Sequence, residues 1–377
     1  MPGPLEIFLV AAPGLEQVLA DEARGAGFSV LDITAGGVTI GGTWPDVWRA
    51  NLELRGTGSV LVRLGRFRAS HLSELDKRAR KFPWGEVLHP DVPVKVSASC
   101  KASRIYHSGA VKQRIEQALQ EELGVALSDD VGIEVMARIE HDICTISLDT
   151  SGDLLHKRGH KAAIAKAPLR ETMAALFLRQ CGYTGNEPVL DPMCGSGTFI
   201  LEAAEIALGL KPGRSRHFAF EKLKTFDASV WHQVRTSGTT TMAAKTATKT
   251  HLHFIGFDRD AGAIRAAAAN AERAGVSSVT ELKQQPISDL RRPDGPPGLV
   301  IVNPPYGGRI GDRRKLAALY ATLGRVLREG FSGWRVGLIT NDKALASHTN
   351  LPFLPPGAPV LHGGLRIYLF RTDAPRA

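Results

Sequence analysis

Two short segments of the chain contain residues whose types and spacing are suited to chemistry. Residues 191–198 have the spacing D-x-x-x-G-x-G, and about a hundred residues later residues 303–306 read Asn-Pro-Pro-Tyr. Glycines permit positive φ angles and let a bulky ligand lie against the main chain. The first segment has neither the dinucleotide spacing G-x-G-x-x-G nor the lysine of a phosphate loop. A loop that begins with Asp191 instead favours a ligand with a cationic amino-acid group, such as S-adenosylmethionine.

The flanking sequence places this loop between a strand and a helix. Residues 188–190 are short and apolar, and residues 199–207 have a helical pattern. The N-terminus of that helix would direct its amide groups at the ligand. A glycine-rich turn without a ligand is the structural alternative. We predict that the cofactor is bound by Asp191, Met193, Gly195, Gly197 and Thr198.

Acidic residues after two further elements complete the predicted pocket. Residues 253–258 form a predicted strand that ends in Asp258, where a carboxylate can hold a ribose diol. The alternative role for Asp258 is to cap the Ala-rich helix predicted over residues 261–274. Asp289 is a further acidic candidate, for which a helix cap is the alternative role. Its expected role at the adenine amine of the cofactor, with the Gln285 amide as a substitute, is implied only by the family resemblance described below.

The second segment follows an apolar, β-branched run at residues 299–302, which is typical of a parallel strand buried on both faces. An exocyclic amine on a base is a poor nucleophile, because its lone pair is delocalised into the ring. The side-chain oxygen of Asn303 and the carbonyl of Pro304 can accept its two N–H groups, while Tyr306 stacks on the ring. We therefore predict that these three residues are catalytic. A turn stiffened by proline is the alternative.

The charge balance predicts a polyanionic partner. The chain has 47 Lys and Arg residues against 38 Asp and Glu residues, a net charge of +9. Aromatic side chains such as Phe82, Trp84 and Tyr106 lie among the basic groups, as stacking on unpaired bases requires. A solvated basic face over core aromatics is the alternative. We predict that structured RNA is bound by Lys77, Arg78, Arg80, Lys81, Lys101, Arg104, Lys157, Arg158 and Arg309.

Composition limits the remaining possibilities. A length of 377 residues with 43% hydrophobic residues permits two or three domains that each bury a core. Four cysteines without a C-x-x-C pair indicate neither a disulfide framework nor a metal site, and they fit a reducing cytoplasm. No run of 18 apolar residues and no signal-peptide pattern is present, so neither membrane insertion nor export is expected. We expect a monomer, with a Thr/Ala-rich low-complexity insertion at residues 236–250.

Over nearly its whole length the chain resembles the bacterial THUMP-domain RNA guanine-N2 methyltransferases, the group that includes large-subunit ribosomal RNA enzymes. Several matching motifs are specific to this group, because generic methyltransferases share only the loop and the Asn-Pro-Pro-Tyr segment. The amino-terminal part is similar to the lead-in domain and THUMP module of the same group. The matching stretches are residues 12–22, 36–38, 48–55, 148–152, 155–160, 167–172, 191–198, 212–213, 218–221 and 303–311.

The resemblance implies an α/β protein with three domains. These are a ferredoxin-like lead-in at 1–66, a THUMP RNA-binding domain at 67–154, and a Rossmann-like class I methyltransferase domain at 155–377 with a mixed, mostly parallel seven-stranded sheet. It implies methyl transfer from S-adenosylmethionine to guanine N2 in 23S ribosomal RNA, with a tRNA guanine as the alternative.

Two other functions have to be weighed against this one. An adenine-N6 nucleic-acid methyltransferase would share the Asn-Pro-Pro-Tyr segment, but the Gly-Gly-Arg-Ile-Gly extension and the amino-terminal half argue against it. A non-catalytic RNA-binding protein on the same scaffold would be expected to lose Asp191 or Asn303, and both are present.

Overall fold

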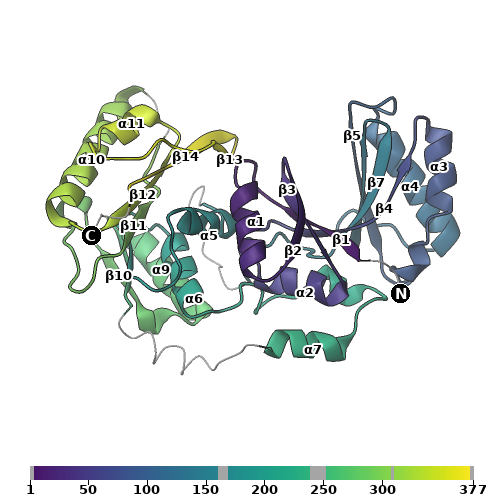
Figure 1. Cartoon of the computed structure of the whole chain (residues 1–377), viewed down its shortest axis with the longest axis horizontal. Helices are drawn as coiled ribbons and strands as arrows, with labels where there is room; N and C mark the ends of the chain where they lie inside the picture. The colour runs from purple at the N-terminus through teal and green to yellow at the C-terminus, as the bar shows by residue number, and fades with distance from the viewer. Residues whose placement is uncertain (1–3, 160–168, 238–251, 307–309, 374–377) are drawn as a thin grey trace. The chain divides into compact units, whose positions relative to one another are not determined.

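The computed structural model describes residues 4–159, 169–237, 252–306 and 310–373, without the side chains of residues 310–312. The chain divides into two compact units, and each contains one seven-stranded sheet (Figure 1). The first unit is made of Met1–Ala11, Ala20–Leu155 and Arg216–Thr239, and the second of Ala12–Leu19, His156–Ser215 and Thr240–Ala377.

The sheet of the first unit has the strand order β2-β3-β1-β4-β7-β6-β5. Neighbouring strands are antiparallel except for β5 and β6, which are parallel. The sheet is continuous through residue 66, where the sequence predicted a boundary between two domains, and the domain boundaries stay a prediction. The strands are β1 (Leu5–Val10), β2 (Ser29–Thr34), β3 (Gly37–Gly42), β4 (Val60–Arg68), β5 (Val94–Lys101), β6 (Ile133–Glu140) and β7 (Ile143–Asp149).

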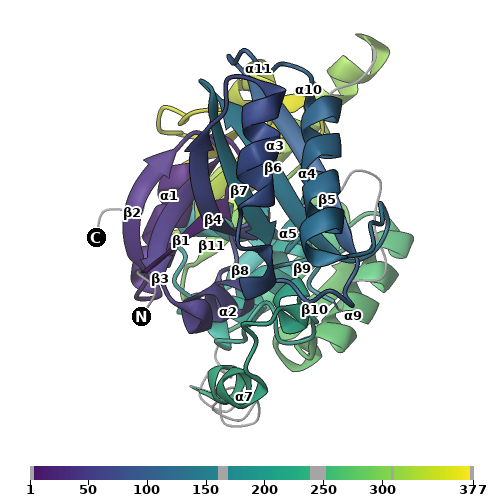
Figure 2. The ribbon, with the colours of Figure 1, turned by 90° about the vertical axis from the view of Figure 1, so that its right-hand side faces the viewer.

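Helices cover the core face of this sheet. Alternation along the strands places Ile7, Leu9 and Val62 in the core. Helices α3 and α4 lie side by side (Figure 2), and α3 contacts β4 while α4 contacts β5 and β6. Helix α2 begins at a capping box, in which the Asp46 carboxylate accepts the Thr43 N–H at 2.8 Å. The helical elements of this half of the chain are α1 (Glu16–Gly25), α2 (Trp44–Glu53), α3 (Leu72–Arg80), η1 (Trp84–Glu86) and α4 (Ser108–Leu123).

A later segment of the chain belongs to the same core. Residues Arg216–Thr239 contain η2 (Ala219–Lys222) and α7 (Ala228–Thr236), and they group with the first unit. Phe220 stacks on Trp48 of α2, with ring centroids 6.0 Å apart. Trp231 contacts Phe220 edge-on at 5.0 Å. A piece of the predicted catalytic domain therefore supplies aromatic side chains to the amino-terminal core.

The sheet of the second unit has the order β10-β9-β8-β11-β12-β14-β13. The five strands β10, β9, β8, β11 and β12 run parallel to one another, whereas β14 pairs antiparallel with both β12 and β13. This topology confirms the prediction of a mixed, mostly parallel seven-stranded Rossmann-like sheet. The strands are β8 (Val189–Asp191), β9 (Phe254–Asp258), β10 (Thr280–Gln284), β11 (Leu299–Val302), β12 (Arg335–Thr340), β13 (Val360–His362) and β14 (Leu365–Arg371).

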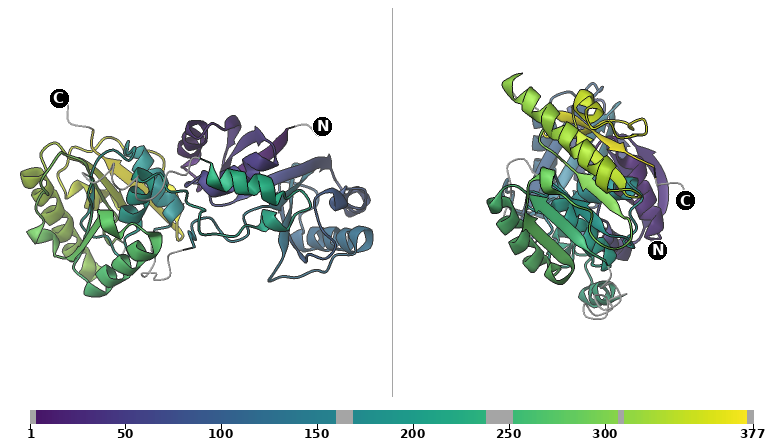
Figure 3. Two further views of the ribbon diagram at one scale, coloured as in Figure 1. Left: turned by 90° about the horizontal axis from the view of Figure 1, so that it is seen from below. Right: turned by 90° about the vertical axis from the view of Figure 1, so that its left-hand side faces the viewer.

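Helices make β11 a fully buried strand. Its residues Val300 and Val302 pack with Leu338 of β12 and with Tyr320 and Leu323 of the long helix α10, drawn in yellow-green in the right view of Figure 3. Parallel neighbours bring the carboxyl ends of β8, β9, β11 and β12 to one edge of the sheet. The helical elements of this half are α5 (Glu171–Gln180), α6 (Thr198–Ala207), α9 (Ala261–Ala274), η3 (Ser277–Val279), η4 (Ile287–Asp289), α10 (Ile310–Gly330) and α11 (Lys343–Ser347).

None of the helices in the described part of the chain is long and apolar enough to span a membrane.

Candidate active site

The predicted cofactor loop connects the end of β8 to the start of α6. Gly195 and Gly197 have φ angles of 54° and 87°, in the left-handed region that favours glycine. A Cβ added at Gly197 would lie 3.3 Å from the Ala267 Cβ, so this glycine permits close packing on α9. A Cβ added at Gly195 would meet nothing within 4 Å. The main chain at Gly195 therefore faces open space in which a ligand can lie.

Asp191 is buried at the end of β8, with 2% of its surface exposed. Its carboxylate accepts the Met193 N–H at 3.0 Å. Burial raises the pKa of Asp191 to about 8; the Met193 N–H opposes this rise, and the nearby Asp258 carboxylate adds to it. A cation bound beside Asp191 would favour its ionised form.

Asp258 joins the end of β9 to the loop. Its Oδ2 accepts the Gly195 N–H at 3.0 Å, and its Oδ1 accepts the Asp260 N–H at 2.9 Å. The N-cap of α9 is Asp260, whose carboxylate accepts the Gly262 N–H at 2.8 Å. The helix-cap alternative for Asp258 is therefore wrong. Its carboxylate lies instead at the rim of the loop, where the ribose role predicted for it remains open to test.

Cys194 has a packing role in the loop. Its N–H donates to the Phe257 carbonyl at 2.8 Å, and a Cβ added at Gly256 would lie 3.0 Å from its sulfur. Burial raises the pKa of the Cys194 thiol. The side chain thus fills the space between the loop and β9.

Two other predicted cofactor ligands, Thr198 and Asp289, differ from each other in exposure. Thr198 is the first residue of α6 and is buried, whereas Asp289 ends η4 with an exposed carboxylate. The Ser288 hydroxyl lies 2.9 Å from the Asp289 Oδ1, and the N-cap of η4 is Pro286. Asp289 is therefore no helix cap, and its role toward adenine stays a prediction.

Asn303 follows directly after β11. Its side-chain oxygen is buried and has no hydrogen-bond partner among the described residues. A buried polar atom without a partner costs about 1–3 kcal/mol, so the Asn303 oxygen needs a donor, and a bound ligand can supply it. Pro304 is buried and Tyr306 is half-buried, and burial raises the pKa of the Tyr306 hydroxyl.

Tyr320 of α10 is a residue of this site that the sequence did not single out. It is fully buried, and its hydroxyl oxygen lies 3.4 Å from the Pro305 carbonyl oxygen and 3.2 Å from the Thr340 Oγ1. A hydroxyl can donate to the first and accept from the second. Tyr320 thus connects the Asn-Pro-Pro-Tyr turn to the end of β12. In the sequence it is one apolar position of an amphipathic helix, which carries no functional signal.

Some of the predicted RNA-binding residues gather at one place in the first unit. Lys77, Arg78 and Lys81 are exposed and line a hollow of about 500 Å³ together with Glu74. The Ser70 N–H donates to the Glu74 carboxylate at 2.8 Å and lowers the pKa of that carboxyl. Arg68 also lines this hollow and is exposed, so four basic side chains surround one engaged acid.

Other predicted RNA-binding cations already have acidic neighbours. Their charges are partly neutralised, although Lys101 and Arg104 remain mostly exposed. Arg80 pairs with Asp76 at 2.9 Å and with Glu121, Lys101 pairs with Glu140 at 2.9 Å, and Arg104 lies 3.8 Å from Asp142.

The prediction for Arg158 was wrong. Its side chain is 1% exposed, and its Nε lies 2.9 Å from the Glu202 carboxylate, which is also buried. A guanidinium enclosed in the protein cannot contact RNA, and here it holds the chain against α6. Lys157 is exposed. Arg309 lies outside the described residues.

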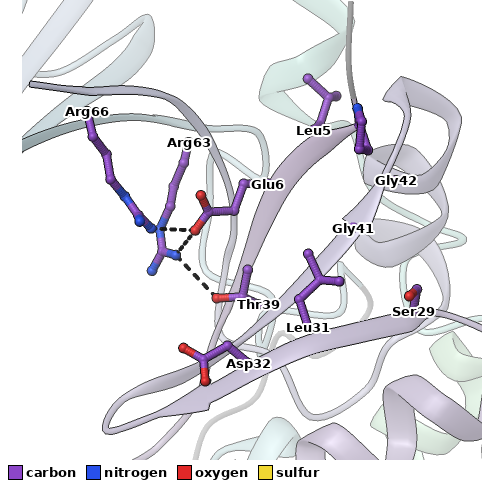
Figure 4. Close-up of a pocket in the computed structure, with 11 residues that line it drawn as sticks. Leu5, Glu6, Ser29, Leu31, Asp32, Thr39, Gly41, Gly42, Arg63 and Arg66 are labelled. Atoms are coloured by element: carbon purple, nitrogen blue, oxygen red, sulfur yellow. Dashed lines mark hydrogen bonds and ion pairs between the residues drawn. The ribbon is translucent and has the colours of Figure 1, made fainter.

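Two further basic residues lie on the open face of the first sheet. Figure 4 shows the Arg63 and Arg66 guanidinium groups beside each other, where both contact the Glu6 carboxylate, and Arg63 also donates to the Thr39 hydroxyl at 3.2 Å. They line a hollow of about 650 Å³. These four polar groups satisfy one another, whereas Asp32 also lines the hollow and has an exposed carboxylate.

No group of three or more His, Cys, Asp or Glu side chains in the described ranges is arranged to hold a metal ion.

The fold and the site together define a class. A Rossmann-like sheet with a glycine loop after one strand, an acid after the next, and Asn-Pro-Pro-Tyr after a third is the arrangement of a class I methyltransferase. Residues 158–351 match the family described as the RMKL-like methyltransferase domain, and residues 6–61 match the RlmL ferredoxin-like domain. The chain belongs to the RMKL-like methyltransferase family.

Two curated relatives illustrate the family. "Ribosomal RNA large subunit methyltransferase K/L" of Syntrophotalea carbinolica is 34% identical over 373 residues, which are 93% of this chain and 51% of that protein. A Synechocystis protein named provisionally as an RNA methyltransferase is 30% identical over 377 residues, 97% of this chain and 96% of that protein. The chain thus spans about half the length of the K/L relatives.

Solved structures agree on the fold. The crystal structure of SMU.472, named provisionally as a methyltransferase and complexed with SAH, has a TM-score of 0.88 and 26% identity, with 100% of both chains covered. A structure from Listeria monocytogenes, named for N6-adenine-specific DNA methylation, has a TM-score of 0.87 and 27% identity over 99% of this chain and 97% of that one.

Proposed function

We propose that the protein is an S-adenosylmethionine-dependent RNA methyltransferase that modifies the exocyclic N2 amine of a guanine in large-subunit ribosomal RNA. The observation that carries the proposal is the buried side-chain oxygen of Asn303 at the end of β11, which has no hydrogen-bond partner among the described residues. Asn303 lies in the turn after β11. Strand β11 pairs with β8, the strand after which the glycine loop begins.

The residues of the loop fit this cofactor. Open space in front of Gly195 can receive it, and the buried Asp191 can balance a cationic amino-acid group. Asp258 offers a carboxylate for the ribose at the rim of the loop. When bound, S-adenosylmethionine supplies an electrophilic methyl group on a sulfonium.

The Asn-Pro-Pro-Tyr turn at residues 303–306, which we name the clamp, positions the acceptor base. The Asn303 oxygen and the Pro304 carbonyl accept the two amine hydrogens of a base turned out of its stack, and the Tyr306 ring supports the base. These contacts hold the amine nitrogen with its lone pair toward the methyl group. Tyr320 keeps the turn in place through the Pro305 carbonyl, and the displaced amine proton leaves to solvent.

The amino-terminal unit serves the RNA in this proposal, with residues 1–66 as a lead-in domain and residues 67–154 as a THUMP domain. The exposed Lys77, Arg78 and Lys81 are its phosphate contacts. We further propose a monomer that acts in the cytoplasm without a metal ion.

The relatives favour ribosomal RNA because the Syntrophotalea protein is named for it. A tRNA guanine is the alternative acceptor. The name of the Listeria structure keeps an adenine amine as a second candidate, since adenine and guanine both present an exocyclic amine.

The test is mass spectrometry of modified nucleosides. Ribosomal RNA and tRNA are isolated from a strain that lacks the protein and are then incubated with the purified protein and S-adenosylmethionine. We expect N2-methylguanosine to be absent from one position of ribosomal RNA in the deletion strain and restored in vitro. Restoration only in tRNA would select the alternative, and N6-methyladenosine would overturn the guanine assignment.

A further inference from the structure

A further hollow lies in the second unit, between the start of α10 and α11. It has a volume of about 440 Å³, and we name it the α10–α11 hollow. Its lining residues come from α10 and from the chain after β12. They are Arg313, Leu316, Asn341, Asp342, Lys343, Ala344 and Leu345.

A chain of hydrogen bonds connects this hollow to the clamp. The Tyr320 hydroxyl lies 3.4 Å from the Pro305 carbonyl oxygen and 3.2 Å from the Thr340 Oγ1. The Asp342 N–H then donates to the same Thr340 oxygen at 3.2 Å. Strands β11 and β12 are parallel neighbours, so the hollow opens at the strand end next to that of Asn303.

The hollow is cationic. Arg313 is 68% exposed, and Arg314, Lys315 and Lys343 are exposed as well. Asp342 is the one acid among the described lining residues, and its charge is engaged. One of its oxygens accepts the Ala344 N–H at 2.9 Å to cap α11, and the other lies 3.3 Å from Arg313. The surface therefore attracts an anion.

Asn341 adds an unsatisfied hydrogen-bonding group to this surface. Its side-chain oxygen is buried and has no partner in the described part of the chain, as for Asn303. An asparagine amide can pair with the edge of a base through an acceptor and a donor. Leu316 gives the same hollow an apolar wall against which a base can lie.

We propose that the α10–α11 hollow binds the nucleotide next to the target guanine in the RNA strand. Asn341 reads the edge of its base, and Arg313 and Lys343 hold its phosphate. A nucleotide has these three parts, namely an anion, a flat apolar face and a hydrogen-bonding edge, and the hollow has a counterpart for each. This inference rests on the proposed RNA substrate, and it adds a site that selects the sequence around the target.

Methyl transfer to ribosomal RNA from the deletion strain tests the site. We expect Asn341→Ala and the double variant Arg313→Ala/Lys343→Ala each to lower kcat/KM for RNA by roughly tenfold, mainly through KM. The shift in Tm caused by SAH should stay as in the wild type. The matched control is Arg325→Ala, which removes another exposed cation from α10, where Arg325 pairs with Glu329. It should leave KM unchanged.

A short RNA hairpin that contains the mapped target gives the sharper result. An abasic nucleotide on one side of the target should weaken methylation by the wild type, and the same change should have little further effect in Asn341→Ala. Equal losses in both proteins would overturn the inference, as would an unchanged KM in both hollow variants. A wild type that binds SAH but methylates no RNA would instead refute the proposed function.

Discussion

Asn303 is the side chain on which the proposed chemistry depends most. Asn303→Ala removes an acceptor aimed at the amine in the transition state, and it also removes a buried oxygen that has no partner in the described part of the chain. We expect turnover to fall roughly a hundredfold, about 3 kcal/mol, while SAH binding is nearly unchanged. Single-turnover methyl transfer to RNA measures the first effect and calorimetry the second. Full activity would mean that the Asn-Pro-Pro-Tyr turn is only structural.

Gly195 tests the cofactor loop. In the Gly195→Val variant the added side chain would project into the open space where we place the ligand, so SAH should no longer raise the Tm. Gly363→Val is a matched control, because Gly363 has a φ of 55° against 54° for Gly195, and a Cβ there also meets nothing within 4 Å. If both variants lose the same stability but only Gly195→Val loses the SAH response, backbone strain is excluded as the cause.

The raised pKa of Asp191 predicts how the free energy of unfolding depends on pH. Burial raises its pKa from 3.8 to about 8, so between these values the native state retains a proton that the unfolded chain releases. The free energy of unfolding should therefore decrease as the pH rises from about 4 to about 8, by at most about 1.4 kcal/mol per pH unit.

The control for this prediction is Asp191→Asn, which keeps the shape of the side chain and cannot ionise. Urea unfolding at several pH values should give a flatter curve for this variant than for the wild type. Identical slopes in the two proteins would show that the Asp191 carboxyl does not cause the pH dependence.

The segment with η2 and α7 shows how one element can stabilise a distant part of the chain. Phe220 is fully buried and contacts Trp48, Phe226 and Trp231. Phe220→Ala should lower the free energy of unfolding by about 3–5 kcal/mol, because it leaves a cavity in this aromatic cluster. Tyr106→Ala, at a side chain that is 84% exposed, should cost little. Urea unfolding followed by tryptophan fluorescence compares the two variants.

The same packing affects the design of fragments. A fragment that ends at residue 154 lacks Phe220 and Trp231 and leaves Trp48 without its partners. Poor folding of such a fragment would therefore say nothing about RNA binding. Tests of the RNA surface belong in the full chain.

The division of labour between the two units predicts how salt affects the whole protein. Replacement of Lys77, Arg78 and Lys81 by alanine removes three exposed cations of the first unit. RNA affinity should fall, and the slope of log K against log salt should decrease by up to about three. SAH binding in the second unit should not change. Filter binding at several salt concentrations measures the slope. An unchanged slope would show that the hollow lined by Lys77, Arg78 and Lys81 does not contact RNA.

The sequence predicted the parts of the molecule that depend on neighbouring residues. The glycine loop, the buried strand β11 and the helix over Ala261–Ala274 all lie where local pattern indicated, because turn chemistry and apolar periodicity act over short stretches. The mixed, mostly parallel character of the second sheet followed from the family resemblance, whereas the order of its strands was not predicted. The basic composition could not show which cations face solvent.

Tertiary structure alone decided which residues meet across long separations. Arg158 reads as one of a run of surface cations, but it is buried because Glu202 on α6 compensates its charge. Phe220 packs against Trp48 because aromatic side chains pack with the apolar surface that the fold brings near them. Asn341 and Asn303 share one edge of the sheet because β11 and β12 are parallel neighbours. Local sequence determines the elements, whereas burial and pairing depend on contacts that no local pattern encodes.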